Sequence, residues 1–165
     1  MLLRKTLLAA LCACAMLPLA GACAADSRQF ASEQGTISVT PIAKGLDHPW
    51  AVAFLPDMQG FLVTERPGHL RVVSPDGKLS APLTGVPEVW AKGQGGLLDV
   101  ALSPDFKRDR TVYLSYAEGG GKGGTAGTAV GRGQLSADLK SLSNFKVILR
   151  QEPKLSTGNH FGSRL

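Results

Sequence analysis

The stretch that decides the fold is AVAFLPD at residues 51–57, because it returns as DVALSPD at residues 99–105. Valine, alanine, proline and aspartate coincide when the two stretches are aligned at an offset of 48 residues. Each copy reads as a short apolar strand that ends in a Pro-Asp turn. A period of about 40–50 residues with several short strands per unit is typical of a β-propeller blade. The repeat therefore predicts an all-β fold built from blades.

Further short strands follow each copy in the same order. We expect strands over 61–65 and 70–73 after the first copy, and over 111–116 and 127–135 after the second. A closed propeller needs at least about four blades, whereas this chain supplies roughly two. We therefore interpret the chain as the N-terminal part of a larger protein. The alternative is a chance repeat, because an apolar run before Pro-Asp is a common strand end.

Composition agrees with short strands and turns. The 165 residues include 20 glycines and 10 prolines, with 6% aromatic residues and a formal net charge of +5. These values exclude a disordered acidic tail, a collagen-like chain and a coiled coil. The densest basic cluster, at 107–110, is interrupted and preceded by aspartates, so we interpret it as a solvated loop and expect no nucleic-acid partner. The glycine-rich stretch 119–124 lacks the spacing of a phosphate-binding loop and reads as a hairpin loop.

The N-terminus has the layout of a secretory signal peptide. Arg4 and Lys5 precede the apolar run 7–19, which is shorter than the roughly 20 residues that span a bilayer, and the small residues 20–25 follow. We expect a signal peptide over 1–24, cleaved after Ala24 or Ala25. The alternative is a lipoprotein signal that leaves Cys23 acylated and the protein membrane-bound, although Ala20 stands where such a signal prefers a large aliphatic residue.

Cleavage there would remove all three cysteines, so we expect no disulfide and no thiolate chemistry in the exported chain. Residues 25–36 show few apolar residues and no clear period, and we expect a flexible lead-in. The partial propeller is expected over 37–165.

Two short glycine-rich segments stand just before predicted inner strands or at the start of a further strand set. Gln94 lies within 93–96, and His160 lies within 157–162. Residues in this position of a propeller point at the central channel, so we expect both side chains to face one pocket. A neutral imidazole can act as a general base, although an isolated histidine is more often structural. His48 is expected to order a turn and His69 to be exposed, and no histidine pair has metal-ligand spacing.

The segments LDHPWAVAF at 46–54, GQGGLLDV at 93–100 and LSTGNHFG at 155–162 occur in this order and spacing. Together they resemble the soluble PQQ-dependent aldose sugar dehydrogenases of the bacterial periplasm, within the glucose/sorbosone dehydrogenase family. The resemblance covers residues from about 36 to the end. It implies a six-bladed β-propeller, of which this chain covers roughly the first two blades. It also implies periplasmic oxidation of an aldose at C1 to a lactone, with pyrroloquinoline quinone (PQQ) taking the hydride and Ca²⁺ polarising the quinone.

The resemblance assigns roles to three residues. His160 matches the histidine that removes the C1 hydroxyl proton, and Gln94 matches a glutamine that contacts sugar and cofactor. Asn159 falls where some relatives carry an aspartate that helps to hold the sugar, so the preferred aldose stays open, as does the electron acceptor. The Ca²⁺ ligands are expected beyond Leu165, and no metal ligand is named within this chain.

Three other interpretations remain. A propeller of this type can be a non-catalytic binding module, since fold does not fix function, or the chain can be an inactive truncated remnant. A Ca²⁺-dependent lactonase would need a carboxylate-rich channel, and the nearby carboxylates are Asp99, expected in a strand, and Glu88, expected in a loop. The 165-residue chain alone is expected to be inactive and poorly folded, because open blade edges can pair with other chains.

Overall fold

The computed structural model describes residues 27–121, 123–162 and 164–165. The chain divides into one unit up to Thr40 and a second from Pro41 to Leu165. The expected signal peptide over 1–24 and the alternative acylation site at Cys23 lie outside the described residues. Within the described ranges no helix is long and apolar enough to cross a membrane.

The described part of the first unit is a hairpin. Strands β1 (Arg28–Ser32) and β2 (Gly35–Val39) pair antiparallel, from Arg28 opposite Val39 to Ser32 opposite Gly35. The sequence predicts a flexible lead-in over 25–36, and the structure differs because backbone pairing forms these strands without a buried apolar face. No hydrophobic pattern predicts the hairpin, because its three large apolar side chains stay about half exposed, at Phe30, Ile37 and Val39.

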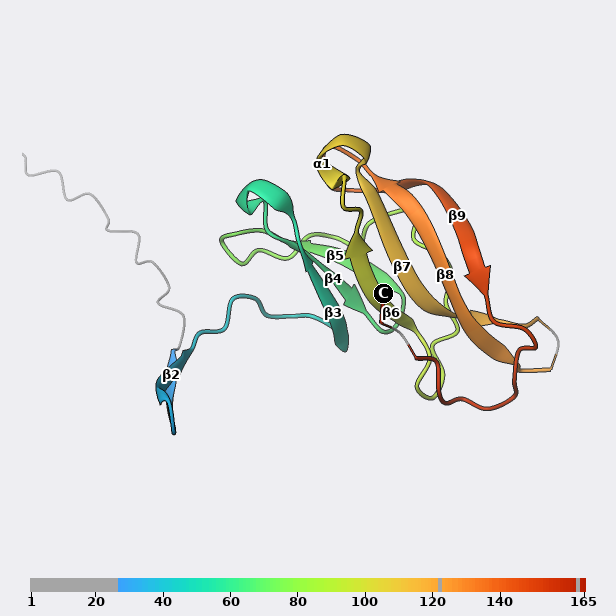
Figure 1. Cartoon of the computed structure of the whole chain (residues 1–165), viewed down its shortest axis with the longest axis horizontal. Helices are drawn as coiled ribbons and strands as arrows, with labels where there is room; N and C mark the ends of the chain where they lie inside the picture. The colour runs from blue at the N-terminus through green and yellow to red at the C-terminus, as the bar shows by residue number, and fades with distance from the viewer. Residues whose placement is uncertain (1–26, 122, 163) are drawn as a thin grey trace, which may run out of the picture. The chain divides into compact units, whose positions relative to one another are not determined.

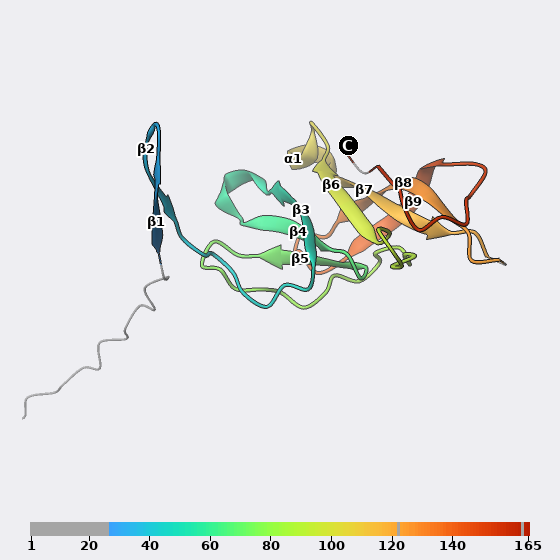
Figure 2. The same cartoon turned by 90° about the horizontal axis from the view of Figure 1, so that it is seen from below.

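The second unit contains two antiparallel sheets, which lie side by side in Figures 1 and 2. The first has the order β3 (Pro49–Phe54), β4 (Phe61–Glu65), β5 (His69–Val73), with a 3₁₀ turn η1 (Pro56–Met58) after β3. The second has the order β6 (Leu97–Leu102), β7 (Thr111–Gly119), β8 (Ala126–Leu135), β9 (Leu142–Arg150), with a short helix α1 (Phe106–Asp109) after β6. Sequential antiparallel strands of this kind form a propeller blade.

In the second unit the predicted strands are confirmed, and among the described residues there one further strand is present that the sequence does not predict. Strand β4 covers the predicted range 61–65, and β5, β7 and β8 begin within one residue of their predicted starts. The glycine-rich stretch connects β7 to β8, as expected of a hairpin loop. The additional strand is β9. The sequence does not predict it because most of its residues are exposed and its apolar residues do not alternate cleanly with polar ones.

The 48-residue repeat is also present in the register shifts and in the hydrogen bonds of the two sheets. The β3–β4 register shifts between Pro49 and Val52, and the β6–β7 register shifts between Leu97 and Val100, which is the same place one repeat later. At each bulge a side-chain hydroxyl oxygen accepts a hydrogen bond from a backbone N–H. The Ala51 N–H donates to Thr64 Oγ1 at 3.0 Å, and the Asp99 N–H donates to Ser115 Oγ at 3.0 Å. A chance repeat does not explain this agreement, so the two sheets are equivalent units.

The core lies between the two sheets. It is one cluster of buried apolar side chains from both, including Leu62, Leu70, Leu97, Val112 and Leu114. Burying a side chain of this size contributes about 1.5–3 kcal/mol, so this contact dominates the stability of the second unit.

A buried hydrogen bond adds a polar connection between the sheets. The Thr64 hydroxyl on β4 donates to the Leu98 carbonyl on β6 at 2.6 Å. The bond fixes how the first sheet lies against the second at this point.

The basic cluster lies on and after α1, and its cations are partnered. Lys107 pairs with Asp57 at 2.6 Å, and Arg108 pairs with Asp105 at 2.6 Å. Arg110 lies 4.8 Å from the Phe106 ring centroid and donates to the Ser136 carbonyl. These contacts agree with the interpretation as a solvated loop.

Candidate functional site

A cavity of about 490 Å³ opens where loops from the two sheets meet. Its walls come from β3, from the turn after β4, from the loop before β6 and from the segment after β9. Seven residues line it: Trp50, Arg66, Gly93, Gln94, His160, Phe161 and Gly162. The structure thus brings together two of the three site residues expected from the sequence.

Gln94 and His160 are directly connected. The His160 N–H donates to Gln94 Oε1 at 3.0 Å, across 66 positions of sequence. The Gln94 N–H in turn donates to the Gly158 carbonyl at 2.8 Å. His160 has a φ of +65°, a left-handed backbone that a non-glycine residue adopts rarely. These two hydrogen bonds hold the segment in that conformation.

The two loops approach so closely that a side chain would not fit between them. Gly93 has a φ of +56°, and a Cβ at that position would lie 2.5 Å from the Gly158 carbonyl oxygen. Such a distance is well inside van der Waals contact, so only glycine allows this crossing. This close approach of the two loops explains why the segment is rich in glycine.

A buried aromatic contact fixes the segment directly after His160. The Phe161 side chain is buried and lies against Trp90, with ring centroids 5.8 Å apart. The Thr128 hydroxyl on β8 donates to the Phe161 carbonyl at 2.6 Å. His160 is therefore held from both sides, by Gln94 at its own N–H and by Phe161 after it.

Arg66 joins the two sheets at the edge of the cavity. Its Nη1 donates to the carbonyls of Gly93 at 3.1 Å and Gly95 at 3.3 Å, which flank Gln94. The Leu97 N–H donates to the Arg66 carbonyl at 3.0 Å. The sequence does not predict this role, because an arginine in a turn usually reads as a solvated charge. The sequence feature that could have indicated this role is the position of Arg66 directly after an apolar strand and beside Glu65.

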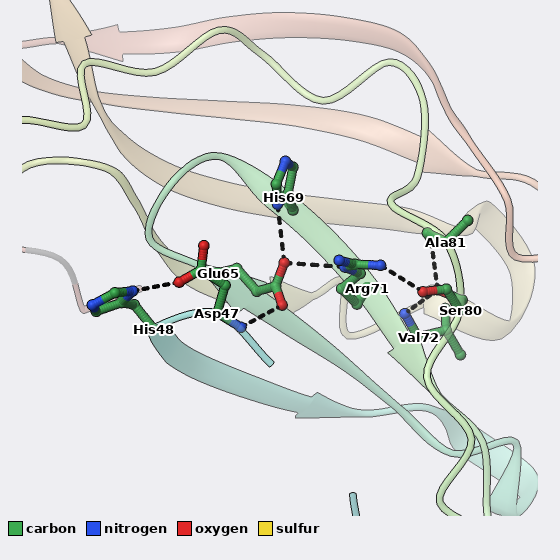
Figure 3. Close-up of polar contacts among 8 residues, drawn as sticks. All are labelled: Asp47, His48, Glu65, His69, Arg71, Val72, Ser80 and Ala81. Carbon is green, nitrogen blue, oxygen red and sulfur yellow. Dashed lines mark hydrogen bonds and ion pairs between the residues drawn. The ribbon is translucent and has the colours of Figure 1, made fainter. Parts of the chain in front are cut away.

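Glu65 is a fully buried carboxylate beside this turn, and Figure 3 shows its partners. Oε1 accepts the Asp47 N–H at 2.8 Å, and Oε2 accepts Arg71 Nε at 3.0 Å and lies 3.1 Å from His69 Nδ1. Burial raises the pKa of Glu65. The hydrogen bonds from Asp47, Arg71 and His69 and the Arg71 charge outweigh burial, so the net pKa is lowered. The carboxylate thereby ties the segment before β3 to the β4–β5 hairpin.

The other two histidines lie outside the cavity lining. His48 is exposed, has a φ of +48° and contacts Asp47 through Nδ1 at 2.5 Å. Its carbonyl accepts the Arg66 N–H at 3.0 Å, so the residue takes part in ordering the turn, as expected. The His69 side chain is 45% exposed, also as expected, although its contact with Glu65 was not foreseen.

Asn159 stands apart from its neighbours. It is exposed and is not among the residues that line the cavity, although it lies between Gly158 and His160 in the chain. Its role in holding a sugar stays a prediction. Asp99 lies on β6 and Glu88 in a loop, as expected.

Metal ligands are not gathered in these two blades. In the part of the chain that the structure describes, no three or more histidine, cysteine, aspartate or glutamate side chains are grouped to hold a metal ion. A Ca²⁺ site built on grouped carboxylates is therefore not found among the described residues.

Comparisons with known proteins agree on one group. The family model Glucose / Sorbosone dehydrogenase matches residues 46–165. A relative from Escherichia coli strain K12, aldose sugar dehydrogenase YliI, is 58% identical over 130 residues, which are 79% of this chain and 35% of that protein. The crystal structure of the soluble aldose sugar dehydrogenase from Escherichia coli in the apo-form matches with a TM-score of 0.69 and 61% identity, over 72% of this chain and 34% of that one.

A more distant structure carries a cofactor. The PQQ-bound form of aldose sugar dehydrogenase from Streptomyces coelicolor matches with a TM-score of 0.58 and 28% identity, over 74% of this chain and 35% of that one. The chain thus spans about a third of the length of the relatives it matches. Its two sheets are about two blades of their β-propeller, and the predicted fold class is confirmed.

Proposed function

Because the chain belongs to the glucose/sorbosone dehydrogenase family, we propose that it is the N-terminal part of an enzyme that oxidises aldose sugars at C1 to the lactone with PQQ. The observation that carries this proposal is the cavity in which Gln94 and His160 meet. The relatives named as aldose sugar dehydrogenases support the substrate class.

His160 is the proposed general base. A hydride leaves C1 more easily as the C1 hydroxyl loses its proton, and a neutral imidazole within hydrogen-bond reach can take that proton. The position of His160 supports this role, because the residue lines the cavity and its backbone is fixed from both sides. PQQ, when bound, supplies the redox chemistry by accepting the hydride.

Gln94 is the proposed contact for sugar and cofactor. Its Oε1 already accepts the His160 N–H, so the group left for a ligand is the side-chain NH₂ with its two donors. Asn159 is proposed to approach the sugar from the exposed side of the same segment.

The lining of the cavity suits an anionic, planar ligand. It offers an amide, an imidazole and the Trp50 ring beside the positive charge of a guanidinium that itself donates to backbone carbonyls, and no carboxylate is among the lining residues. PQQ is a planar quinone that carries carboxylates, so this donor set fits part of its surroundings. We propose that the Ca²⁺ ligands and the remaining PQQ contacts belong to other blades of the complete protein.

Export to the periplasm is part of the proposal. The N-terminal signal at 1–24 supports it, and acylation at Cys23 would instead attach the protein to a membrane. The intact mass of the exported protein distinguishes the two, since an acylated form would retain Cys23 and carry added lipid mass.

The test is reconstitution of the complete protein. The purified apoprotein is loaded with PQQ and Ca²⁺ and offered a panel of aldoses with an artificial electron-accepting dye. We expect dye reduction and lactone formation that depend on both PQQ and aldose. A protein that binds PQQ or sugar but reduces no dye would be a binding module, and the proposal would then be wrong.

A further inference from the structure

Arg66 makes contacts that a solvated arginine would not make. One nitrogen, Nη1, bonds the carbonyls on both sides of Gln94, at Gly93 and Gly95. An arginine that only balanced surface charge would face a carboxylate, and Arg66 has no carboxylate partner among the described residues. Its guanidinium instead fixes the shape of one loop.

The backbone of Arg66 is fixed independently of its side chain. Its N–H donates to the His48 carbonyl at 3.0 Å, and its carbonyl accepts the Leu97 N–H at 3.0 Å. The close approach to Gly96, where a Cβ would lie 2.2 Å from the Arg66 carbonyl oxygen, leaves the turn little freedom. The guanidinium therefore acts from a rigid base, as a group that positions another should.

We propose that Arg66 is a positioning residue for the site. It holds the Gly93–Gly95 loop so that Gln94 keeps its place, and through Gln94 it fixes the His160 backbone. Two hydrogen bonds from Arg66 to the loop and one between Gln94 and His160 thus connect the β4–β5 turn to the proposed base. This inference rests on the proposed function, because it assigns Arg66 a part in the turnover of that same site.

The predicted effect falls on turnover. A base displaced by about 1 Å can cost about 100-fold in rate, while ground-state binding of a sugar by other groups changes little. Arg66→Met removes the donors and retains the aliphatic stem. We expect kcat to fall by about 10- to 100-fold with KM changed by less than about threefold.

Arg71→Met is the matched control. Arg71 is a largely buried neighbour in the same blade that donates to Glu65 Oε2 and to the Ser80 carbonyl, but it does not touch the Gly93–Gly95 loop. The same chemical change there should lower the melting temperature and leave kcat within about twofold of wild type. Arg66→Lys, which keeps one charged donor group, should restore part of the lost kcat.

Two further measurements separate positioning from general damage. In the apoprotein, amide hydrogen exchange should become faster in peptides covering 93–95 and 158–160 in Arg66→Met but not in Arg71→Met. In a double-mutant cycle, Arg66→Met combined with Gln94→Ala should be no slower than Gln94→Ala alone, because Arg66 acts through Gln94. Should Arg66→Met fail to fold, Arg66→Lys is compared in the same assays.

The outcomes are distinct. A kcat loss equal to that of Arg71→Met, a change confined to KM, unchanged exchange in both loops, or multiplicative effects in the cycle would each overturn the positioning role. A wild-type holoprotein that oxidises no aldose would overturn the proposed function instead, and the exchange measurement would still report on Arg66 in the apoprotein.

Discussion

Gln94 accepts the backbone N–H of His160 through its side-chain oxygen at 3.0 Å, although 66 positions of sequence separate the two residues. The bond joins the loop before β6 to the segment after β9. Only the amide oxygen is used, so the donors of Gln94 and the imidazole of His160 can serve one ligand in the cavity they line. Turnover should therefore depend on this pairing and on the contacts around it.

His160→Asn tests the proposed base. Asparagine tolerates the left-handed backbone at this position, so the segment should keep its shape while the base is lost. In the reconstituted complete protein we expect kcat to fall by about 10²- to 10⁴-fold. His69→Gln is the control, since His69 contacts Glu65 outside the cavity. Equal turnover in wild type and His160→Asn would contradict the assignment.

Two substitutions separate the role of the Gln94 side-chain oxygen from that of its NH₂ group. Gln94→Glu keeps an oxygen for the His160 N–H but removes the two donors, whereas Gln94→Met removes both functions. We expect Gln94→Glu to lower kcat/KM by about 10- to 100-fold, the value of one or two lost hydrogen bonds, with His160 amide exchange still slow. Gln94→Met should lose activity and show fast exchange. Slow exchange in Gln94→Met would show that the amide oxygen does not hold His160.

Acid should destabilise the second unit through Glu65. The folded-state pKa of Glu65 is lowered from its ordinary value of 4.5, so the unfolded chain binds the proton more readily. Its contribution is complete above about pH 4.5 and is lost as the pH falls through the folded pKa. Denaturant unfolding between about pH 5 and 3 should therefore show a shallower loss of stability in Glu65→Gln than in wild type.

Salt provides the control for that measurement. The Asp76 carboxylate is exposed, and its hydrogen bond from Lys78 lowers its pKa to about 2. At about 1 M salt the screening length is about 3 Å, so an exposed pair of this kind should contribute little. The buried Glu65 should keep its effect at high salt. A Glu65 contribution that disappears together with that of Asp76 would contradict the buried network.

Gly96→Ala tests the close packing of the loop against Arg66. Gly96 has a φ of +147°, and a Cβ there would meet the Arg66 carbonyl oxygen at 2.2 Å. Gly121 is the control, because it also has a positive φ, of +76°, but a Cβ there would meet nothing within 4 Å. Both variants bear the backbone cost of about 1 kcal/mol. We expect thermal unfolding to show a larger loss for Gly96→Ala, and similar losses would mean that the loop yields easily.

The 165-residue chain alone should bind hydrophobic dyes. Alternate residues of β3 expose large apolar side chains, with Trp50, Val52 and Phe54 at 46%, 50% and 75% exposure. Apolar patches of this kind mark surfaces that other protein covers. We expect Val52→Thr/Phe54→Thr to reduce dye fluorescence in the isolated chain more than the hairpin change Phe30→Thr. Equal reduction would mean that the β3 face is not the main exposed surface.

Much of the fold was predictable because the repeat carries it. The paired stretches 51–57 and 99–105 set the blade period, and the turn residues set the strand ends. Strand β9 and the first hairpin escaped prediction because their side chains are largely exposed, so backbone pairing rather than burial creates them.

The site was predictable in part. Glycine-rich segments flagged Gln94 and His160, and the cavity lining shows that they meet. Arg66 escaped because its partners are backbone carbonyls, which no side-chain pattern reveals. The buried partners of Glu65 were hidden for a related reason: one of them is the Asp47 backbone amide.

The crossing of Gly93 over Gly158 has a consequence for redesign. A Cβ on Gly93 would lie 2.5 Å from the Gly158 carbonyl oxygen, so a library that varies Gly93 will consist mostly of damaged proteins, whereas a Cβ on Gly158 would meet its nearest atoms at 3.5 Å, an ordinary contact. Asn159 lies next to this crossing but is exposed. Under the proposed role of Asn159 in holding the sugar, variation aimed at a new sugar preference belongs at this exposed position, where a change of side chain is accommodated more readily.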